Sequence, residues 1–191
     1  MDYSLFPTVF PVLHSEGITL RELTDIDLPA WFERLTDSEA AGLAGDPIAE
    51  SMEEVISGLE YHKVGFRFKE SIRWAIIPDD IGESVGTVGF NSFDPANNSA
   101  DIGYAIGRSY WNKGIATRAV RIVINYGFDV LNLKRIEAEV LTHNGASIRV
   151  LEKLGFHRYA QDAIDQEPNQ DTEQYANFFL NQRNNMHVIN S

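Results

Sequence analysis

The sequence of 191 residues contains no cysteine. Disulfide bonds and a thiol nucleophile are therefore both excluded. It also contains no apolar run that approaches the roughly 20 residues a helix needs to cross a bilayer. Pro7 and Pro11 interrupt the apolar residues near the N-terminus, and no basic segment precedes them. We therefore expect no signal peptide, no membrane partner and a cytoplasmic location.

Positive charge is scarce as well, because 16 lysines and arginines face 28 aspartates and glutamates and the formal net charge is −12. A nucleic acid would be repelled on average, so we expect no nucleic-acid partner. A cationic amine or a basic peptide would be attracted. An acidic surface that only keeps the protein soluble is the alternative interpretation. The five histidines have no metal-ligand spacing, so we expect no metal site.

The rest of the composition is that of a soluble globular chain, with 43% hydrophobic and 23% charged residues. A chain of this length is expected to form one domain, which we place at residues 17–191. Residues 1–16 are expected to form an N-terminal arm, in which Phe6, Phe10 and Leu13 are able to pack.

The spacing of apolar residues predicts the order of strands and helices. Strands are expected at 18–22, 72–77, 85–93, 100–106, 136–141, 156–160 and 175–180. Helices are expected from Asp25 or Asp27 to Leu35, and at 51–66, 115–131 and 147–154, the last ended by Gly155. Gly42, Gly45 and Pro47 are expected to break the chain, and 161–174 to form a polar loop. Hairpins followed by a β-α-β-α-β segment indicate a mixed α/β (α+β) fold. The 175–180 strand, if it were an exposed edge, could pair between chains.

Residues 107–119 read Gly-Arg-Ser-Tyr-Trp-Asn-Lys-Gly-Ile-Ala-Thr-Arg-Ala and join a predicted strand to a predicted helix. The first turn of a helix has unpaired backbone N–H groups, and together with the helix dipole they favour an anion such as a pyrophosphate. Gly114 has no Cβ that would keep a phosphate away from the main chain, and Lys113 adds a positive charge. A P-loop is not indicated, because it requires glycine before lysine.

A second stretch, residues 143–156, reads His-Asn-Gly-Ala-Ser-Ile-Arg-Val-Leu-Glu-Lys-Leu-Gly-Phe. Together with Asp-Ile-Gly-Tyr-Ala-Ile at 101–106 and Tyr-Trp-Asn-Lys-Gly-Ile-Ala-Thr at 110–117, it resembles the Gcn5-related N-acetyltransferase (GNAT) superfamily. The likeness is greatest to its ribosomal-protein N-acetyltransferase (RimJ/RimL-like) branch and covers roughly residues 17–161. It implies the GNAT fold, in which helices flank a mixed, mostly antiparallel central sheet. It also implies acetyl transfer from acetyl-CoA to an amine, without a metal.

The resemblance further implies which residues bind acetyl-CoA. The turn before the 115–131 helix would contact the pyrophosphate, and the 100–106 strand and the residues around 144–147 would contact the pantetheine arm. These residues are Ala105, Ile106, Lys113, Gly114, Ile115, Ala116, Thr117, Asn144 and Ser147. A bulge in the 100–106 strand would open its edge and free backbone groups for the cofactor. We interpret Trp111 as structural, although many members of the superfamily carry Gln or Arg there.

Asp101 is the first candidate for the general base, because it aligns with the strand glutamate of the histone acetyltransferase members. Its side chain is one methylene shorter than glutamate, so transfer of the proton through a water is an option. A solvated carboxylate at a strand start is the alternative interpretation. Glu137 and Glu139 are candidate substitutes, because residues two apart in a strand point to the same side.

Departure of the thiolate is assisted by a tyrosine in many relatives, but Leu151 stands at that place here. We therefore assign the hydrogen bond to sulfur to Ser147 and the positioning of pantetheine to Asn144. Capping of the 147–154 helix by either residue is the alternative. Arg118 departs from the glutamate that is frequent in the branch, which indicates either altered substrate recognition or a solvated helix residue.

Without a cysteine, the expected mechanism is direct attack of the amine on the thioester in a ternary complex. An α-amino group, with a pKa of about 7.7–8.0, needs less help from a base than a lysine amine near 10.4. A protein N-terminus and a small amine both remain candidate acceptors, and the 51–66 helix and the 40–50 loop are expected to line their site. A non-catalytic acyl-CoA-binding or sensing domain is the alternative function. The chain is expected to be a monomer or a homodimer.

Overall fold

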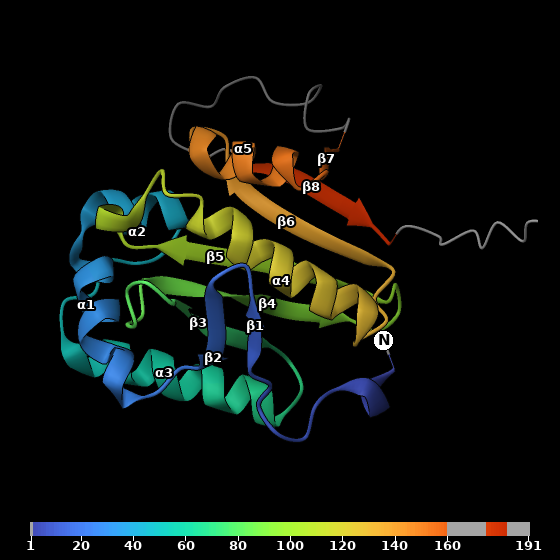
Figure 1. Ribbon diagram of the computed structural model, residues 1–191, viewed down its shortest axis with the longest axis horizontal. Coiled ribbons are helices and arrows are strands. Elements are labelled where there is room, and N and C mark those ends of the chain that lie inside the picture. Colours follow the sequence, from blue (N-terminus) through green and yellow to red (C-terminus); the bar gives the residue numbers. More distant parts are fainter. Residues whose placement is uncertain (1, 160–174, 183–191) are drawn as a thin grey trace, which may run out of the picture.

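The strands form one eight-stranded sheet, and helices cover both of its faces (Figure 1). The computed structural model describes residues 2–159 and 175–182. The strands are β1 (Leu13–Ser15), β2 (Ile18–Glu22), β3 (Ile72–Pro78), β4 (Gly86–Asp94), β5 (Ser99–Ile106), β6 (Arg135–Leu141), β7 (His157–Arg158) and β8 (Tyr175–Asn181). The α-helices are α1 (Leu28–Thr36), α2 (Ser38–Ala44), α3 (Met52–Arg67), α4 (Ile115–Asp129) and α5 (Gly145–Lys153). Short 3-10 turns lie at Tyr3–Leu5, Asp25–Asp27 and Arg108–Tyr110.

The order of strands across the sheet is β1-β2-β3-β4-β5-β6-β8-β7. All neighbouring pairs are antiparallel except β5 and β6, which are parallel. That parallel ladder joins only Ser99–Asp101 to Arg135–Glu137. The rest of β5, as far as Ile106, stays paired with β4 but not with β6. The sheet is therefore split between β5 and β6, and the mixed, mostly antiparallel sheet of the predicted GNAT fold is confirmed.

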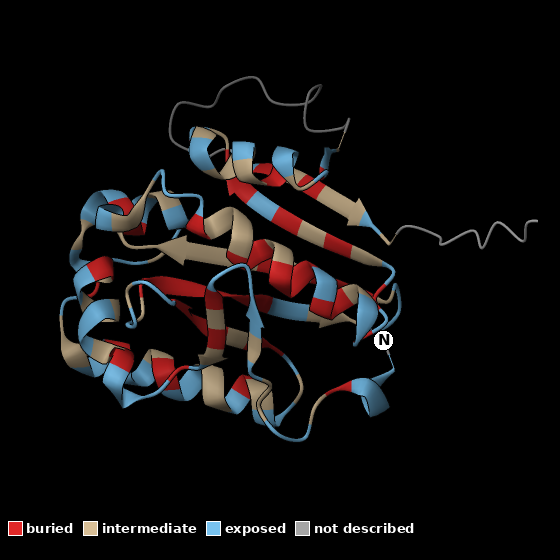
Figure 2. Cartoon of the chain, viewed as in Figure 1, coloured by how far each residue is buried: buried red, intermediate tan, exposed pale blue. Residues whose placement is uncertain are grey.

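Both faces of the sheet are covered, which explains why β3 is almost continuously apolar. Trp74 and Ile76 pack into the large core beneath α4, whereas Ala75 and Ile77 pack into a smaller cluster with Leu59 of α3. Buried residues consequently run along the inner side of α4 and along the central strands (Figure 2). The core fixes the positions of the strand ends, where the candidate site lies.

The helices begin and end largely where capping residues predict. Ser51 caps α3 through a hydrogen bond from the backbone N–H of Glu54 to its hydroxyl, as the sequence pattern predicts. The predicted break at Gly42 is wrong, because Gly42 lies inside α2. Asp37 caps the start of α2 with two hydrogen bonds from backbone N–H groups, and Gly45 ends it with φ of 71°. Caps at both ends thus stabilise a short helix despite its glycine.

The N-terminal residues pack against the sheet and α3. Phe6 is buried and contacts Phe66 and Phe93 through its ring, and the indole N–H of Trp74 donates to the carbonyl of Pro11 at 2.8 Å. Leu13 lies in β1, which pairs with β2. The boundary at residue 17 stays a prediction.

The last strand, β8, is not an edge strand, because it lies between β6 and β7. Within the strand predicted at 156–160, His157–Arg158 form β7, and residue 160 lies outside the described residues. The loop predicted at 161–174 lies outside the described residues. No helix in the described part of the chain has the length and apolar character that crossing a membrane requires.

Candidate active site

A cavity of about 420 Å³ opens where β5 leaves β6, between the end of β5, the start of α4 and the start of α5. Every residue predicted to bind the cofactor lines this cavity except Lys113. The predicted members are Ala105, Ile106, Gly114, Ile115, Ala116, Thr117, Asn144 and Ser147. Residues 104–117 and 144–153, which are far apart in the sequence, thus meet around one space.

The start of α4 presents free backbone donors to this cavity. Gly114 precedes the helix with φ of 71°, and no heavy atom lies within 4 Å of the position a Cβ would take. No side chain caps the helix, and its first turn carries no acidic residue. The first N–H groups of α4 are therefore available to an anion, and the helix dipole favours one there.

The turn before α4 is held by Trp111, whose indole N–H donates to the carbonyl of Ile106 at 2.7 Å. This hydrogen bond agrees with the structural interpretation of Trp111, whose side-chain role stays a prediction. This hydrogen bond engages the carbonyl of Ile106, one of the two residues of the 100–106 strand predicted to contact the pantetheine arm. The ammonium of Lys113 lies 5.3 Å from the ring centroid of Tyr110, and Lys113 is not among the lining residues.

The open edge of β5 has a different origin from the one predicted. The bulge lies in β4 between Phe90 and Ser92, not in β5. The edge of β5 is open because its ladder with β6 ends at Asp101. The predicted free strand edge is present, but the divergence of two parallel strands creates it.

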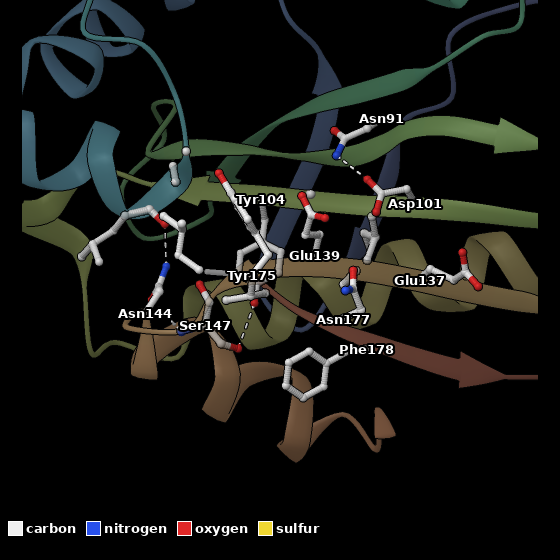
Figure 3. Close-up of a pocket in the computed structure, with 18 of the residues that line it drawn as sticks. Asn91, Asp101, Tyr104, Glu137, Glu139, Asn144, Ser147, Tyr175, Asn177 and Phe178 are labelled. Atoms are coloured by element: carbon white, nitrogen blue, oxygen red, sulfur yellow. Dashed lines mark hydrogen bonds between the residues drawn. The ribbon is translucent and has the colours of Figure 1, made fainter. Parts of the chain in front are cut away.

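A second cavity, of about 760 Å³, lies at the split between β5 and β6 (Figure 3). It shares Leu43, Ala44, Tyr104, Asn144 and Ser147 with the first cavity. Its charged lining residues are Asp101, Glu137 and Glu139, and no lysine or arginine is among the described residues that line it. Leu43 to Gly45 contribute to the wall, as predicted for the 40–50 loop. The prediction for the second helix is wrong, because no residue of α3 lines either cavity.

Asp101 is half-buried in this second cavity, and the side-chain amide of Asn91 donates to its carboxylate at 2.6 Å. Burial raises the pKa of the Asp101 carboxyl above its ordinary value, and the nearby carboxylate of Glu139 raises it further. The hydrogen bond from Asn91 opposes this rise in pKa. A carboxylate with a raised pKa accepts a proton more readily than an ordinary one.

The two glutamates predicted as substitutes lie on the same side of β6 and face the same cavity. Glu137 accepts a hydrogen bond from the hydroxyl of Tyr159 at 2.8 Å and lies 3.8 Å from the guanidinium of Arg135. Glu139 is exposed. Asp101 and Glu137 are both half-buried, and Glu137 is engaged by Tyr159 and Arg135 whereas Asp101 is engaged by Asn91.

Asn144 is buried and caps α5. Its side-chain oxygen accepts from the backbone N–H of Ser147 at 3.0 Å, and its amide donates to the carbonyl of Leu43 at 2.7 Å. The helix therefore begins at Gly145, two residues before the predicted start. Ser147 lies in the first turn, and its backbone carbonyl accepts from the hydroxyl of Tyr104 at 3.1 Å.

Comparison with known proteins decides the family. Residues 18–157 match the Acetyltransferase (GNAT) domain. The chain belongs to the GNAT acetyltransferase family. It is 37% identical over 150 residues to the uncharacterized N-acetyltransferase YoaA of Bacillus subtilis, a match that covers 78% of this chain and 85% of the relative.

Solved structures of other GNAT proteins share the fold. The RimL ribosomal L7/L12 α-N-protein acetyltransferase in complex with coenzyme A is 18% identical with a TM-score of 0.76, over 90% of this chain and 98% of its own. The spermidine N-acetyltransferase of Vibrio cholerae, solved with CoA and spermine, is 19% identical with a TM-score of 0.74, over 88% of this chain and 97% of its own. The family match confirms the resemblance to the GNAT superfamily, and the likeness to its RimJ/RimL-like branch stays a prediction.

Leu151 and Arg118, two positions at which the chain departs from many relatives, both have structural surroundings. Leu151 is fully buried in the core, so its position on α5 does not face the cavities. Arg118 donates to the carbonyl of Glu16 at 2.7 Å, which ties α4 to the turn between β1 and β2. We therefore interpret Arg118 as structural.

Sequence reasoning missed Tyr104 and Asn91. Tyr104 lines both cavities, and burial raises the pKa of its hydroxyl to about 12, so the hydroxyl keeps its proton at neutral pH. The position of Tyr104 within the Asp-Ile-Gly-Tyr-Ala-Ile motif could have identified it as a candidate site residue. Asn91 lies in no motif that we quoted, and only the pairing of β4 with β5 brings it to Asp101.

Proposed function

We propose that this protein transfers an acetyl group from acetyl-CoA to a primary amine by direct attack in a ternary complex. The observation that carries the proposal is the meeting of two cavities at Tyr104, Asn144 and Ser147. The first cavity has an uncapped helix start that suits the pyrophosphate of CoA. The second has carboxylates that suit a cationic acceptor. A thioester that extends through the first cavity would present its carbonyl at the shared wall.

Asp101 is the proposed general base. At pH 7 an alkyl amine with a pKa near 10.4 is neutral in only about one molecule in 2,500, so its proton must be removed before attack. The proton passes to the Asp101 carboxylate, directly or through one water, and the nitrogen then attacks the thioester carbon. The carbon–sulfur bond breaks, and the products are the acetylated amine, the CoA thiol and one released proton.

Ser147 and Tyr104 are the proposed groups on the sulfur side. Both line the shared wall, and the Tyr104 hydroxyl is protonated at neutral pH because burial raises its pKa to about 12. A hydroxyl donor near sulfur would stabilise the departing thiolate. In the structure the single hydroxyl proton of Tyr104 is donated to the carbonyl of Ser147, which fixes β5 to the first turn of α5, so Tyr104 would donate to sulfur only by giving up this hydrogen bond.

The acceptor is proposed to be a positively charged primary amine. Three carboxylates line its cavity, and the whole chain has a formal net charge of −12. The names of the related proteins agree with this class, because one acetylates a ribosomal protein at its α-amine and another acetylates spermidine. Both a protein N-terminus and a polyamine therefore belong in the first test.

The experiment is thiol release from acetyl-CoA with a panel of N-terminal peptides, lysine peptides, polyamines, amino acids and aminoglycosides, with CoA binding measured in parallel. Turnover with a cationic amine is the expected result. Tight CoA binding without turnover on any amine would contradict the proposed catalysis and favour an acyl-CoA-sensing domain. Absence of CoA binding would contradict the assignment of the first cavity.

A further inference from the structure

Asn91 joins two charged residues on the strands beside its own. Its side-chain amide donates to the Asp101 carboxylate on β5 at 2.6 Å, and its side-chain oxygen accepts from the guanidinium of Arg73 on β3. A guanidinium can only donate, and an ionised carboxylate can only accept. The Asn91 amide is therefore held in a single orientation, with its NH₂ group toward Asp101.

The backbone around Asn91 is shaped for this contact. Phe90 pairs with Ile102 and Ser92 pairs with Asp101, so Asn91 is the additional residue of the β4 bulge. A Cβ on Gly103 would lie 2.7 Å from the Asn91 amide nitrogen and 3.2 Å from the Arg73 guanidinium. Only glycine at 103 leaves the space that the Arg73–Asn91–Asp101 chain of hydrogen bonds occupies. Arg73 is held in turn by Thr87, whose hydroxyl lies 3.3 Å from the guanidinium.

We propose that Asn91 is a positioning residue for the acetyl transfer, which holds the Asp101 carboxylate in the ionised state and orientation that accept the amine proton. Arg73 positions Asn91 in the same way. This inference rests on the proposed role of Asp101 as general base, and it adds two residues that do not themselves contact the acceptor's reacting atoms.

The charges around Asp101 explain why a hydrogen bond is needed to keep its carboxylate ionised. Burial, Glu139 and Glu137 all raise the pKa of Asp101, and only the hydrogen bond from Asn91 and the charge of Arg73 lower it. The pKa of Arg73 is lowered to about 10, chiefly by burial, and the nearby Arg34 also lowers it while Asp46, Asp101 and Tyr61 raise it. Arg73 therefore stays cationic at neutral pH. Without Asn91, Asp101 would lose its only hydrogen-bond donor among the described residues and face two glutamates.

The test is the pH dependence of kcat/KM with the acceptor that the panel identifies. The proposed reacting complex has the proton count of a cationic amine and an ionised Asp101, so log kcat/KM has a slope of zero between the pKa values of Asp101 and the amine and a slope of one below the pKa of Asp101. The break between the slopes therefore reports Asp101. Asn91→Leu keeps the side-chain size and removes both hydrogen bonds. We expect the break to move to higher pH and kcat/KM on the acidic side to fall roughly fivefold, the size expected for a partly exposed hydrogen bond to a carboxylate.

Two controls separate positioning from a general structural effect. Ser92→Ala alters the next, exposed residue of β4 and should leave the profile unchanged. In an Asp101→Asn background the break should be absent, and adding Asn91→Leu should have no further effect. Affinity for acetyl-CoA should not change, because Asn91 lines only the second cavity. A loss of rate that is equal at all pH values and persists in the Asp101→Asn background would overturn the proposal.

A second measurement does not depend on turnover. The pKa of the Asp101 carboxyl, followed by NMR of the protein with labelled aspartate, should rise in Asn91→Leu and in Asn91→Ala. An unchanged pKa in a folded variant would overturn the role of Asn91. If the parent protein binds CoA but acetylates no amine, the proposed function fails while this measurement still decides whether Asn91 controls Asp101.

Discussion

Gly114 combines a left-handed backbone with open space beside its α-carbon, at the uncapped start of α4. In Gly114→Glu, a carboxylate would stand where the phosphates are proposed to bind. We expect the affinity for acetyl-CoA, measured by calorimetry, to fall at least about tenfold, because the new charge replaces a favourable helix-terminus contact with repulsion. An unchanged affinity would contradict the phosphate site.

Gly82→Glu is the matched control for this substitution. Gly82 has φ of 79° and, like Gly114, no heavy atom within 4 Å of its Cβ position, but it does not line the first cavity. Both variants should lose about 1 kcal/mol of unfolding free energy from backbone strain. Only Gly114→Glu should lose affinity for acetyl-CoA.

The buried ring of His62 leads us to expect that the stability of the protein depends on pH. Burial lowers its pKa to about 3, its ring is stacked on Trp31, and the buried Nδ1 has no hydrogen-bond partner. Because the folded-state pKa lies below the ordinary value of 6.5, the unfolded chain binds a proton that the folded chain does not. This contribution to stability is complete above pH 6.5 and is lost as the pH falls toward 3, by about 2 kcal/mol at pH 5.

The measurement is urea unfolding of the parent and of His62→Phe at pH 7 and pH 5. The parent should lose about 2 kcal/mol more unfolding free energy than the variant between these pH values. Other titrating groups, Asp101 included, are common to both proteins and cancel in the comparison. Equal losses in the two proteins would show that His62 is not the titrating group.

At the level of elements, the cap of α5 links stability to the cofactor site. Asn144→Ala removes the acceptor for the Ser147 N–H and the donor to Leu43. We expect a loss of about 1–2 kcal/mol of unfolding free energy, seen as a fall of several degrees in Tm. Asn144→Asp keeps the cap and loses only the bond to Leu43, so its Tm should lie between those of Asn144→Ala and the parent. If the Tm of Asn144→Asp equalled that of Asn144→Ala, the hydrogen bond to Leu43 rather than the helix cap would account for the stabilisation.

The helices and strands with strong local signals could be predicted, and those held by tertiary contacts could not. The strand expected at 18–22 is β2, and the helix expected at 115–131 is α4, which ends at Asp129. Helix α2 was missed because Gly42 has a low helix propensity, which two terminal caps outweigh here. Strand β1 was missed because three residues carry too little pattern without their pairing to β2.

The two halves of the candidate site differ in the same way. The residues predicted to bind the cofactor lie in the motifs at 101–106, 110–117 and 143–156, so the sequence alone could identify them. The second cavity combines residues of β4, β5, β6 and β8, and their proximity depends on strand order rather than on local pattern. The sequence alone could therefore not predict that Asn91 and Tyr159 line this cavity.

For the molecule as a whole, the net charge of −12 and the three carboxylates of the second cavity predict a dependence on salt. A cationic acceptor should be attracted at low ionic strength and screened at high ionic strength. Raising sodium chloride from about 20 mM to 500 mM should raise KM for that acceptor roughly threefold to tenfold and leave kcat nearly unchanged. A neutral amine is the control, and an equal change for both would contradict electrostatic attraction.

The position of β8 between β6 and β7 determines the order in which these strands can join the sheet. Among the described strands, β7 pairs only with β8, so it cannot join the sheet until β8 has docked on β6. Opening of β8 necessarily releases β7, whereas β7 is able to open alone. Native-state hydrogen exchange should therefore show amides of β7 exchanging no more slowly than those of β8. Tyr159 and Asn177 lie in or beside these strands, so this wall of the second cavity is complete only when both β8 and β7 are in place.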